Sequence, residues 1–246
     1  MKVKVFETSC ASGAAAAKQA AEKLNAVIKE KGSARLLLST GASQFKFFEH
    51  FVKENVDWSK VEMFHLDEYV DLPETHGASF RKYLKEKFTS KVNLKAAYFV
   101  EGTKENMAYL SKLINESPVD VGLIGIGENA HIAFNDPPAD FNVEDPYIIV
   151  NLNDTCKKQQ VGEGWFATVD DVPKQAVSMS VKQIMKCKNI VSCVPYAVKA
   201  EAIRNTLTSE ITNMVPATIM KNHPSVQIFV DADSASLLPD SVEMVK

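Results

Sequence analysis

The sequence lacks a long apolar run and lacks an excess of charge of either sign. Its longest apolar stretch, VGLIGIG, is far too short to span a bilayer. The chain carries 28 basic and 31 acidic residues, a net charge of −3, without the basic stripe that nucleic-acid and membrane-surface proteins present. We therefore expect no nucleic acid and no membrane among its partners, although a few basic side chains can still hold a small anion.

Cysteines are few, and they show no regular spacing. Cys10, Cys156, Cys187 and Cys193 form no CxxC pair, and no histidines lie at the spacing of a zinc site. We expect them to be reduced and structural, with no metal bound. The N-terminus also lacks the features of a secretory signal, since Glu7 interrupts it and no long apolar core follows. These absences predict a cytoplasmic protein.

What is present is typical of a soluble globular protein. Of the 246 residues, 46% are hydrophobic and 24% are charged, which excludes both a disordered chain and a membrane protein. No repeat, low-complexity tract or linker rich in Pro, Gly and Ser divides the chain. We expect a single domain over residues 1–246.

Short apolar segments alternate with amphipathic ones along the chain. Apolar runs predict strands at 3–6, 34–40, 61–66, 119–127, 176–181, 189–194 and 225–231. Helical spacing predicts helices at 13–31 (closed by Gly32), 44–55, 79–88, 104–117 and 196–207. The alternation predicts an α/β fold, a three-layer Rossmann-like domain with a mainly parallel, doubly wound sheet. Ligands of such folds bind beyond the carboxyl ends of the strands, at a topological switch point.

The first polar strand end is STGAS, at 39–43. Gly41 permits close approach of the backbone, hydroxyls add donors, and free N–H groups at the start of the next helix attract an anion. The stretch is therefore a candidate phosphate site, with Thr40, Gly41, Ala42 and Ser43 as its residues. The alternative is a capped turn that binds nothing.

Two adjacent carboxylates, Asp67 and Glu68, follow the strand at 61–66. Successive side chains of an extended segment point to opposite sides, so only one of the two can face a ligand. A carboxylate at a strand end, partly shielded from water, can act as a base on a carbon next to a carbonyl. The alternative is a helix-capping or solvated pair. His65, inside the strand, is expected to be a packed core residue.

The stretch GIGENAHIAFNDP, at 125–137, places several polar residues on one short loop. Its G-x-G weakly matches a dinucleotide fingerprint, but prolines from Pro137 onward arrive where a helix would have to begin. We interpret the glycines as room for a substrate to approach the backbone. A neutral His131 with a carboxylate nearby can carry protons near neutral pH, and Asn129 and Asp136 flank it.

Taken in order, LSTGAS, FHLDEYVDLP, GIGENAHIAFNDP and VPYAVKAEAI resemble the glucosamine-6-phosphate deaminase/isomerase family, which includes the related 6-phosphogluconolactonases. The resemblance covers about Lys2 to Leu238. It implies conversion of an amino-sugar phosphate, glucosamine 6-phosphate above all, to fructose 6-phosphate and ammonium without metal or organic cofactor. A small sugar phosphate is then the expected partner. The chain lacks the C-terminal extension of longer hexameric members, so we expect a monomer or small homo-oligomer.

Single residues match the catalytic motifs of that family. Asp67 matches the aspartate that shuttles a proton between C2 and C1, and His131 matches the histidine that assists ring opening. Asn129 and Asp136 stand where the best-known members carry two acidic groups. Asn129 can hold the imidazole by a hydrogen bond without adding negative charge, and Asp136 is one methylene shorter than the usual glutamate.

The resemblance also implies a phosphate subsite. Gly41, Ala42 and Ser43 match its loop, with Ala42 in place of a second glycine, and Lys199 of the late helix supplies the charge.

A mobile lid is implied as well. Residues 153–171 are its candidate, because Gly162 and Gly164 could hinge it. They carry Glu163 near the position where some members place an arginine.

Three alternatives remain open. DEY followed by HIAFNDP favours the deaminase over a 6-phosphogluconolactonase, which typically has DER. An isomerase acting on galactosamine 6-phosphate would share these residues. A non-catalytic sugar-phosphate sensor is the third alternative, but such regulators usually carry a helix-turn-helix, for which no room precedes the first strand.

Overall fold

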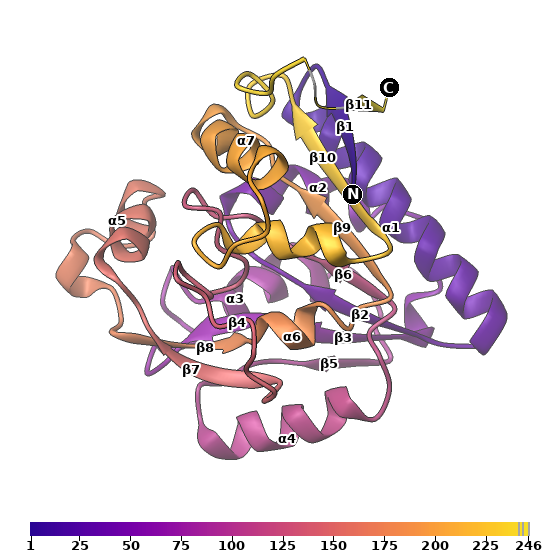
Figure 1. Ribbon diagram of the computed structural model, residues 1–246. Helices are drawn as coiled ribbons and strands as arrows, with labels where there is room; N and C mark the ends of the chain where they lie inside the picture. The colour runs from indigo at the N-terminus through magenta and orange to yellow at the C-terminus, as the bar shows by residue number, and fades with distance from the viewer. Residues whose placement is uncertain (241, 243, 246) are drawn as a thin grey trace.

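The central sheet holds eight strands, and every neighbouring pair in it is parallel. The computed structural model describes residues 1–240, 242, 244 and 245. The strand order is β11-β1-β10-β9-β6-β2-β3-β5 (Figure 1). The strands are β1 (Lys2–Phe6), β2 (Ala34–Leu38), β3 (Val61–His65), β5 (Ala96–Tyr98), β6 (Val121–Leu123), β9 (Asn189–Cys193), β10 (Val226–Asp231) and β11 (Met244–Val245). The predicted parallel sheet is confirmed.

Helices occupy most of the connections. They are α1 (Ser9–Lys31), α2 (Phe45–Phe51), α3 (Phe80–Leu84), α4 (Lys104–Asn115), α5 (Asp154–Gly162), α6 (Val181–Ile184) and α7 (Ala200–Thr208). Short 3₁₀ turns lie at Ala42–Gln44, Trp58–Lys60, Val169–Asp171, Ala197–Lys199 and Pro216–Asn222, and a π-helical turn at Lys85–Thr89 extends α3. Among the described residues, no helix is both long and apolar enough to cross a membrane.

Each face of the sheet has its own apolar core, because successive side chains of a strand point to opposite faces. On β2, Leu36 and Leu38 pack in the core that α1, α2 and α3 cover, whereas Leu37 packs in the core that α4, α6 and α7 cover. Figure 1 shows α1 and α4 at separate margins of the molecule, with strands between them. The predicted three layers are therefore confirmed.

Helix α1 begins four residues before the predicted range of 13–31. The side chain of Thr8 accepts a hydrogen bond from the backbone N–H of Ala11, so it caps the helix earlier than the apolar pattern indicated. Gly32 closes the helix as predicted, in the left-handed conformation with φ of 80°.

Lys199 lies ahead of the late helix and not within it, contrary to the prediction. The helix predicted over 196–207 begins only at Ala200. Tyr196 has a φ of 83°, which a right-handed helix does not allow, and both carboxylate oxygens of Asp231 accept from its N–H at 3.1 Å. The residues between Tyr196 and Ala200 form a 3₁₀ turn that carries Lys199.

A second, antiparallel sheet was not predicted. It has the order β4-β8-β7, with β4 (Asp67–Tyr69), β8 (Gln175–Met179) and β7 (Tyr147–Asn151). Asp67 and Glu68 were expected to be extended, and in the structure Asp67 pairs with Ser178 of β8. A three-residue segment that begins with two carboxylates is too short to show an alternating apolar pattern. It forms a strand because β8 pairs with it.

The switch point of the main sheet lies between β2 and β6. The chain runs from β2 outward through β3 and β5, then returns to the other side of β2 with β6. The strand predicted over 119–127 ends at Leu123, and the backbone N–H of Ser39 donates to the oxygen of Leu123 at 3.0 Å. The loops after β2 and β6 therefore lie side by side, where a ligand is expected.

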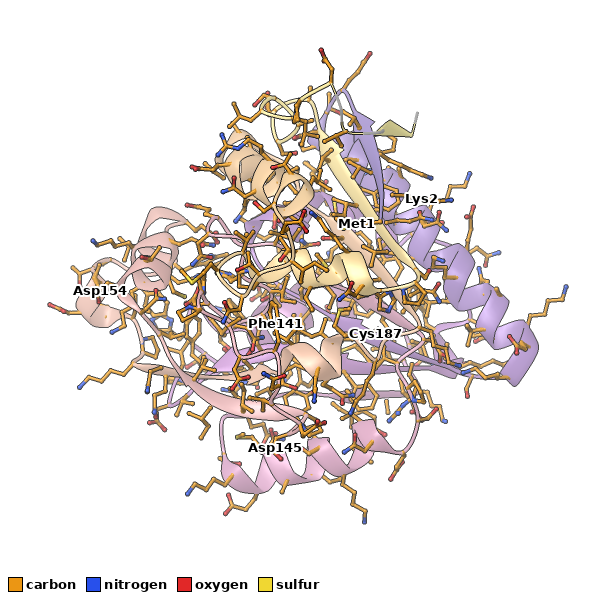
Figure 2. All side chains as sticks on the ribbon, viewed as in Figure 1. Met1, Lys2, Phe141, Asp145, Asp154 and Cys187 are labelled. Carbon is orange, nitrogen blue, oxygen red and sulfur yellow. The ribbon has the colours of Figure 1, made fainter. Side chains whose placement is uncertain are left out.

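The segment 153–171 folds as α5, a loop and a short 3₁₀ turn. In Figure 1 it lies beyond the ends of β7 and β8, with Asp154 at the outer edge of the molecule (Figure 2). Its inner side chains, Cys156 and Phe166, pack with Tyr69 and Phe134 in a third apolar cluster. Gly164 has a φ of 80°, as a hinge or cap glycine has. That this segment acts as a lid stays a prediction.

Candidate active site

A cavity opens where the loops after β2 and β6 meet, at the carboxyl edge of the main sheet. Its lining includes seven of the nine site residues predicted from the sequence: Asp67, His131, Lys199, Thr40, Gly41, Ala42 and Ser43. The other two, Asn129 and Asp136, lie behind His131 and contact it. Segments far apart in the chain thus meet around one space.

His131 is held by both of its flanking polar residues. Its Nδ1 lies 3.0 Å from Oδ1 of Asp136, an ion-pair distance, although the alignment falls outside hydrogen-bond geometry. The same oxygen accepts from Nδ2 of Asn129 at 2.9 Å, and Oδ1 of Asn129 accepts from the backbone N–H of His131 at 3.2 Å. The shorter aspartate therefore does reach the imidazole.

Asp136 is ionised at neutral pH. Burial opposes its charge, but the contacts from His131 and Asn129 outweigh burial and hold the pKa of its carboxyl below the ordinary value. The thiol of Cys156 is a further neighbour, and burial, followed by the nearness of Asp136, raises the pKa of that thiol. A carboxylate facing Nδ1 favours the tautomer with its proton there, which leaves Nε2 for a ligand.

Gly127 provides the space that the imidazole fills. A Cβ on Gly127 would lie 2.2 Å from Cε1 and 2.3 Å from Nε2 of His131, so a side chain there displaces the ring. A Cβ on Gly125 would meet nothing closer than Nε2 of Gln44, at 3.5 Å. The interpretation of both glycines as room for substrate is wrong for Gly127, because the histidine itself takes that room.

The loop around His131 is strained and firmly anchored. Ala130 and Ala133 have positive φ values of 64° and 51°, a conformation that costs a non-glycine residue about 1–3 kcal/mol. Nδ2 of Asn135 donates to the oxygens of Ile132 at 2.8 Å and Met179 at 2.9 Å. Such strain persists only where the surroundings enforce it, so the ring of His131 is preorganised.

Asp67 presents its carboxyl to the cavity from β4 and is only 6% exposed. Burial, with a smaller contribution from the neighbouring charge of Glu68, raises the pKa of Asp67 to about 8. A carboxylate of raised pKa is a stronger base than an ordinary one, and such groups are typical of sites that move protons.

The two adjacent carboxylates have different tasks. Glu68 points away from the cavity and caps α3, accepting from the backbone N–H groups of Arg81 at 2.8 Å and Phe80 at 3.2 Å. The capping alternative therefore holds for Glu68, whereas Asp67 faces the cavity. His65 is fully buried, as expected for a core residue, and burial lowers its pKa to about 3.

The loop after β2 forms another part of the cavity lining. Gly41 has a φ of 106°, and its carbonyl accepts from the hydroxyl of Tyr83 at 3.0 Å, which fixes the loop against α3. The hydroxyl of Ser39 also lines the cavity, and it is buried without a hydrogen-bond partner among the described residues. An unpaired buried hydroxyl of this kind is suited to a ligand oxygen or a water.

Lys199 and Glu163 are neighbours in the cavity lining. Lys199 is only 5% exposed, and its Nζ lies 3.8 Å from Oε1 of Glu163. Burial lowers the pKa of Lys199, while the charges of Glu163 and Glu128 partly oppose that effect. The separation exceeds hydrogen-bond length, so the donors of the ammonium group remain free for a ligand.

Two residues of α5 in the lining, Gln159 and Gln160, were not predicted. Gln160 accepts from the hydroxyl of Tyr69 at 2.6 Å, and Gln159 donates to Glu163 at 2.8 Å. The sequence shows only a polar segment here. The two adjacent glutamines, close to glycines that could form a hinge, were the feature that could have pointed to these lining residues.

Within the part of the chain that the structure describes, no group of three or more His, Cys, Asp and Glu side chains is placed to hold a metal ion. All four cysteines are free thiols. Cys187 lies inside the molecule (Figure 2), and Cys156 and Cys193 are buried as well.

The fold and the cavity define an α/β protein whose site can hold a small anion and move protons on it. Residues 7–229 match the family described as glucosamine-6-phosphate isomerases/6-phosphogluconolactonase, and the chain belongs to this family.

Individual relatives agree with that assignment. A glucosamine-6-phosphate deaminase of Streptococcus pneumoniae (strain 70585) is 34% identical over 219 residues, which cover 86% of this chain and 92% of that protein. A solved structure of a monomeric glucosamine-6-phosphate deaminase has a TM-score of 0.86 at 27% identity, covering 96% of this chain and 100% of that one. A 6-phosphogluconolactonase from Shewanella baltica OS155 shares the fold, with a TM-score of 0.77 at 18% identity and coverage of 94% and 98%.

Proposed function

We propose that this protein is a glucosamine-6-phosphate deaminase, converting glucosamine 6-phosphate and water to fructose 6-phosphate and ammonium. The observation that carries the proposal is the meeting of Asp67, His131 and Lys199 around one cavity. Proton-handling groups and a cation around the same cavity suit a sugar phosphate. The relatives named glucosamine-6-phosphate deaminase support the same substrate.

His131 opens the sugar ring in this mechanism. With Nδ1 facing Asp136, the lone pair of Nε2 is free to take the proton of the C1 hydroxyl and pass it to the ring oxygen. The products are an open-chain aldehyde and a histidine in its starting protonation state. The Gly127 contact and the strained loop hold the ring in position for this transfer.

Asp67 then carries the proton between adjacent carbons. It removes the proton from C2, which is acidified by the C1 aldehyde, and returns it to C1 of the resulting enol. The ammonium group of the substrate favours the ionised form of Asp67 once it is bound, because an opposite charge nearby stabilises a carboxylate. One proton of the ammonium group passes to O1 in this rearrangement, so the nitrogen is left as an iminium on C2, and water adds there to release ammonium and the ketone.

Lys199 and the loop Thr40–Ser43 bind the phosphate. The ammonium of Lys199 supplies charge, and Thr40 and Ser43 can add hydroxyl donors next to the backbone of Gly41. We propose that residues 153–171 close over the sugar, since Gln159, Gln160 and Glu163 line the cavity from that segment.

We also propose a cytoplasmic monomer. Four free thiols suit a reducing compartment, and one solved relative is described as monomeric.

Turnover of three substrates tests the function. Purified protein is incubated separately with glucosamine 6-phosphate, galactosamine 6-phosphate and 6-phosphogluconolactone, and ammonium, ketose phosphate and acid release are measured. We expect ammonium and fructose 6-phosphate from glucosamine 6-phosphate in equal amounts. Turnover of galactosamine 6-phosphate or of the lactone alone would reassign the substrate. Turnover of none, with sugar phosphate still bound, would favour the sensor.

A further inference from the structure

Glu163 stands where a negative charge opposes anion binding. Its Oε1 lies 3.8 Å from Nζ of Lys199, and both residues line the cavity together with the hydroxyl loop after β2. A carboxylate at that position cancels the charge of the lysine in the empty site. A fully ionised phosphate on Lys199 would therefore be brought next to a second anion in a poorly solvated space.

The carboxylate cannot turn away without losing its own partners. Oε1 accepts from Nε2 of Gln159 at 2.8 Å, and Oε2 accepts from Nε1 of Trp165 at 2.9 Å. The ring of Trp165 packs edge-on against Phe45, with centroids 6.4 Å apart, which fixes the indole in turn. Glu163 is thus a preorganised acceptor with lone pairs still available on each oxygen.

We propose that this subsite takes the phosphate group of the substrate as the protonated monoanion, and that Glu163 is the residue that requires the proton. A hydrogen bond from a P–OH group to Glu163 turns a repulsive contact into a charge-assisted one. The remaining oxygens of the phosphate are left for Lys199 and the hydroxyl loop. The inference rests on the proposed function for the identity of the ligand, since it concerns the phosphate end of that cavity.

Apart from Lys199, whose N–H groups bind the remaining phosphate oxygens, the titratable neighbours of Glu163 do not offer an alternative source of the proton. Asp67 and His131 line the cavity too, and they are assigned to the reacting end of the sugar. The nearer titratable groups are Lys199 before α7, Glu128 after β6, Tyr69 on β4 and Cys156 on α5. Burial raises the pKa values of the tyrosine and the cysteine, so both stay neutral, and the glutamate only adds negative charge.

Inorganic phosphate and sulfate distinguish the protonated from the unprotonated ligand. The two anions have the same shape, but near neutral pH phosphate is partly protonated and sulfate is not. Their binding to the wild type is measured by calorimetry at about pH 6 and about pH 8, on either side of the range in which a phosphate loses its second proton. We expect phosphate to bind at least about 10-fold more tightly than sulfate, and more tightly at the lower pH.

Glu163→Gln and Glu128→Gln form the matched pair of variants. Glu163→Gln keeps the size of the side chain and should raise sulfate affinity by about 10-fold or more, abolishing the discrimination. Glu128→Gln removes the other carboxylate near Lys199, which is exposed and has no ion pair with it within 4 Å, and should preserve the discrimination.

Three outcomes would overturn the inference: equal binding of sulfate and phosphate by the wild type, phosphate binding that tightens as the pH rises, or binding of neither anion. None of these measurements needs turnover. A protein that releases ammonium yet fails them would retain the proposed function and lose only this inference. Discrimination without ammonium release would keep the subsite and contradict the function.

Discussion

The imidazole of His131 lies so close to Gly127 that a Cβ on the glycine would be 2.2 Å from Cε1 of the ring. The position of the histidine therefore depends on the absence of one methyl group four residues earlier in the chain. Asp136 approaches the ring at its other nitrogen, with Oδ1 3.0 Å from Nδ1. Gly127 and Asp136 together fix the position of the imidazole ring.

Gly127→Ala should lower kcat on glucosamine 6-phosphate by roughly 100-fold or more, because a displaced His131 loses its acid–base contribution. Gly77→Ala is the control. The same methyl there would meet no atom within 4 Å, and Gly77 does not line the cavity, so the substitution should change kcat far less. Steady-state kinetics of both variants, with thermal unfolding to confirm folding, makes the comparison. Equal losses in the two would refute the specific role of the Gly127 contact.

Asp67→Asn should abolish turnover and leave the affinity for glucosamine 6-phosphate within about 10-fold of the wild type, because it removes a base and not an anion site. Turnover is followed by ammonium release, and affinity by calorimetry with the inactive variant. Wild-type turnover in Asp67→Asn would remove this residue from the mechanism. A loss of affinity as large as the loss of turnover would assign it to binding.

The same substitution should stabilise the fold. Burial raises the pKa of Asp67 to about 8 from an ordinary 3.8, so between these values the folded state holds a proton that the unfolded state has lost. Unfolding then releases a proton, and the free energy of unfolding falls as pH rises through this window, by at most about 1.4 kcal/mol per pH unit. Asp67→Asn removes that contribution.

Urea unfolding at about pH 5 and about pH 8 measures the effect. The stability gain of Asp67→Asn over the wild type should be larger at the higher pH, because the cost of the buried charge is fully present only above the folded-state pKa. A gain that is independent of pH would mean that the carboxyl is not destabilised by burial.

Lys199→Ala should raise the KM for glucosamine 6-phosphate on the order of 10- to 100-fold, the value of a hydrogen bond to a charged group. Its kcat should change much less, since Lys199 is assigned to the phosphate and not to the reacting carbons. Lys46→Ala is the control, because Lys46 is a partly exposed lysine paired with Glu49 on the nearby helix α2. A KM that stays unchanged in Lys199→Ala would move the phosphate elsewhere.

The parallel sheet and the loops at its switch point could be predicted because their signals are local. Buried strands such as β2 are continuous apolar runs, and a polar stretch after such a strand marks the ligand edge. Asp67 and His131 lie in such stretches. Since parallel strands end at the same edge, their separation in the chain does not prevent them from meeting.

Other features depend on contacts between distant segments, which no local pattern contains. β4 is a strand only because β8 pairs with it, with Asp67 opposite Ser178. The position of Lys199 depends on Tyr196, whose positive φ is held by Asp231 from another strand. The contact of Glu163 with Lys199 joins α5 to the turn before α7. The role of Gly127 could not be predicted either, although His131 is only four residues away in the chain. A glycine near a histidine does not indicate whether the substrate or the imidazole fills the space beside it.

Glucosamine 6-phosphate deuterated at C2 tests the role of Asp67 in deamination most directly. The wild type should release the label from C2 as ammonium forms, with part of the deuterium recovered at C1 of fructose 6-phosphate, because one carboxylate serves both carbons. Asp67→Asn should leave the label at C2. Loss of the C2 label at an equal rate in the Asp67→Asn variant would contradict proton transfer by Asp67.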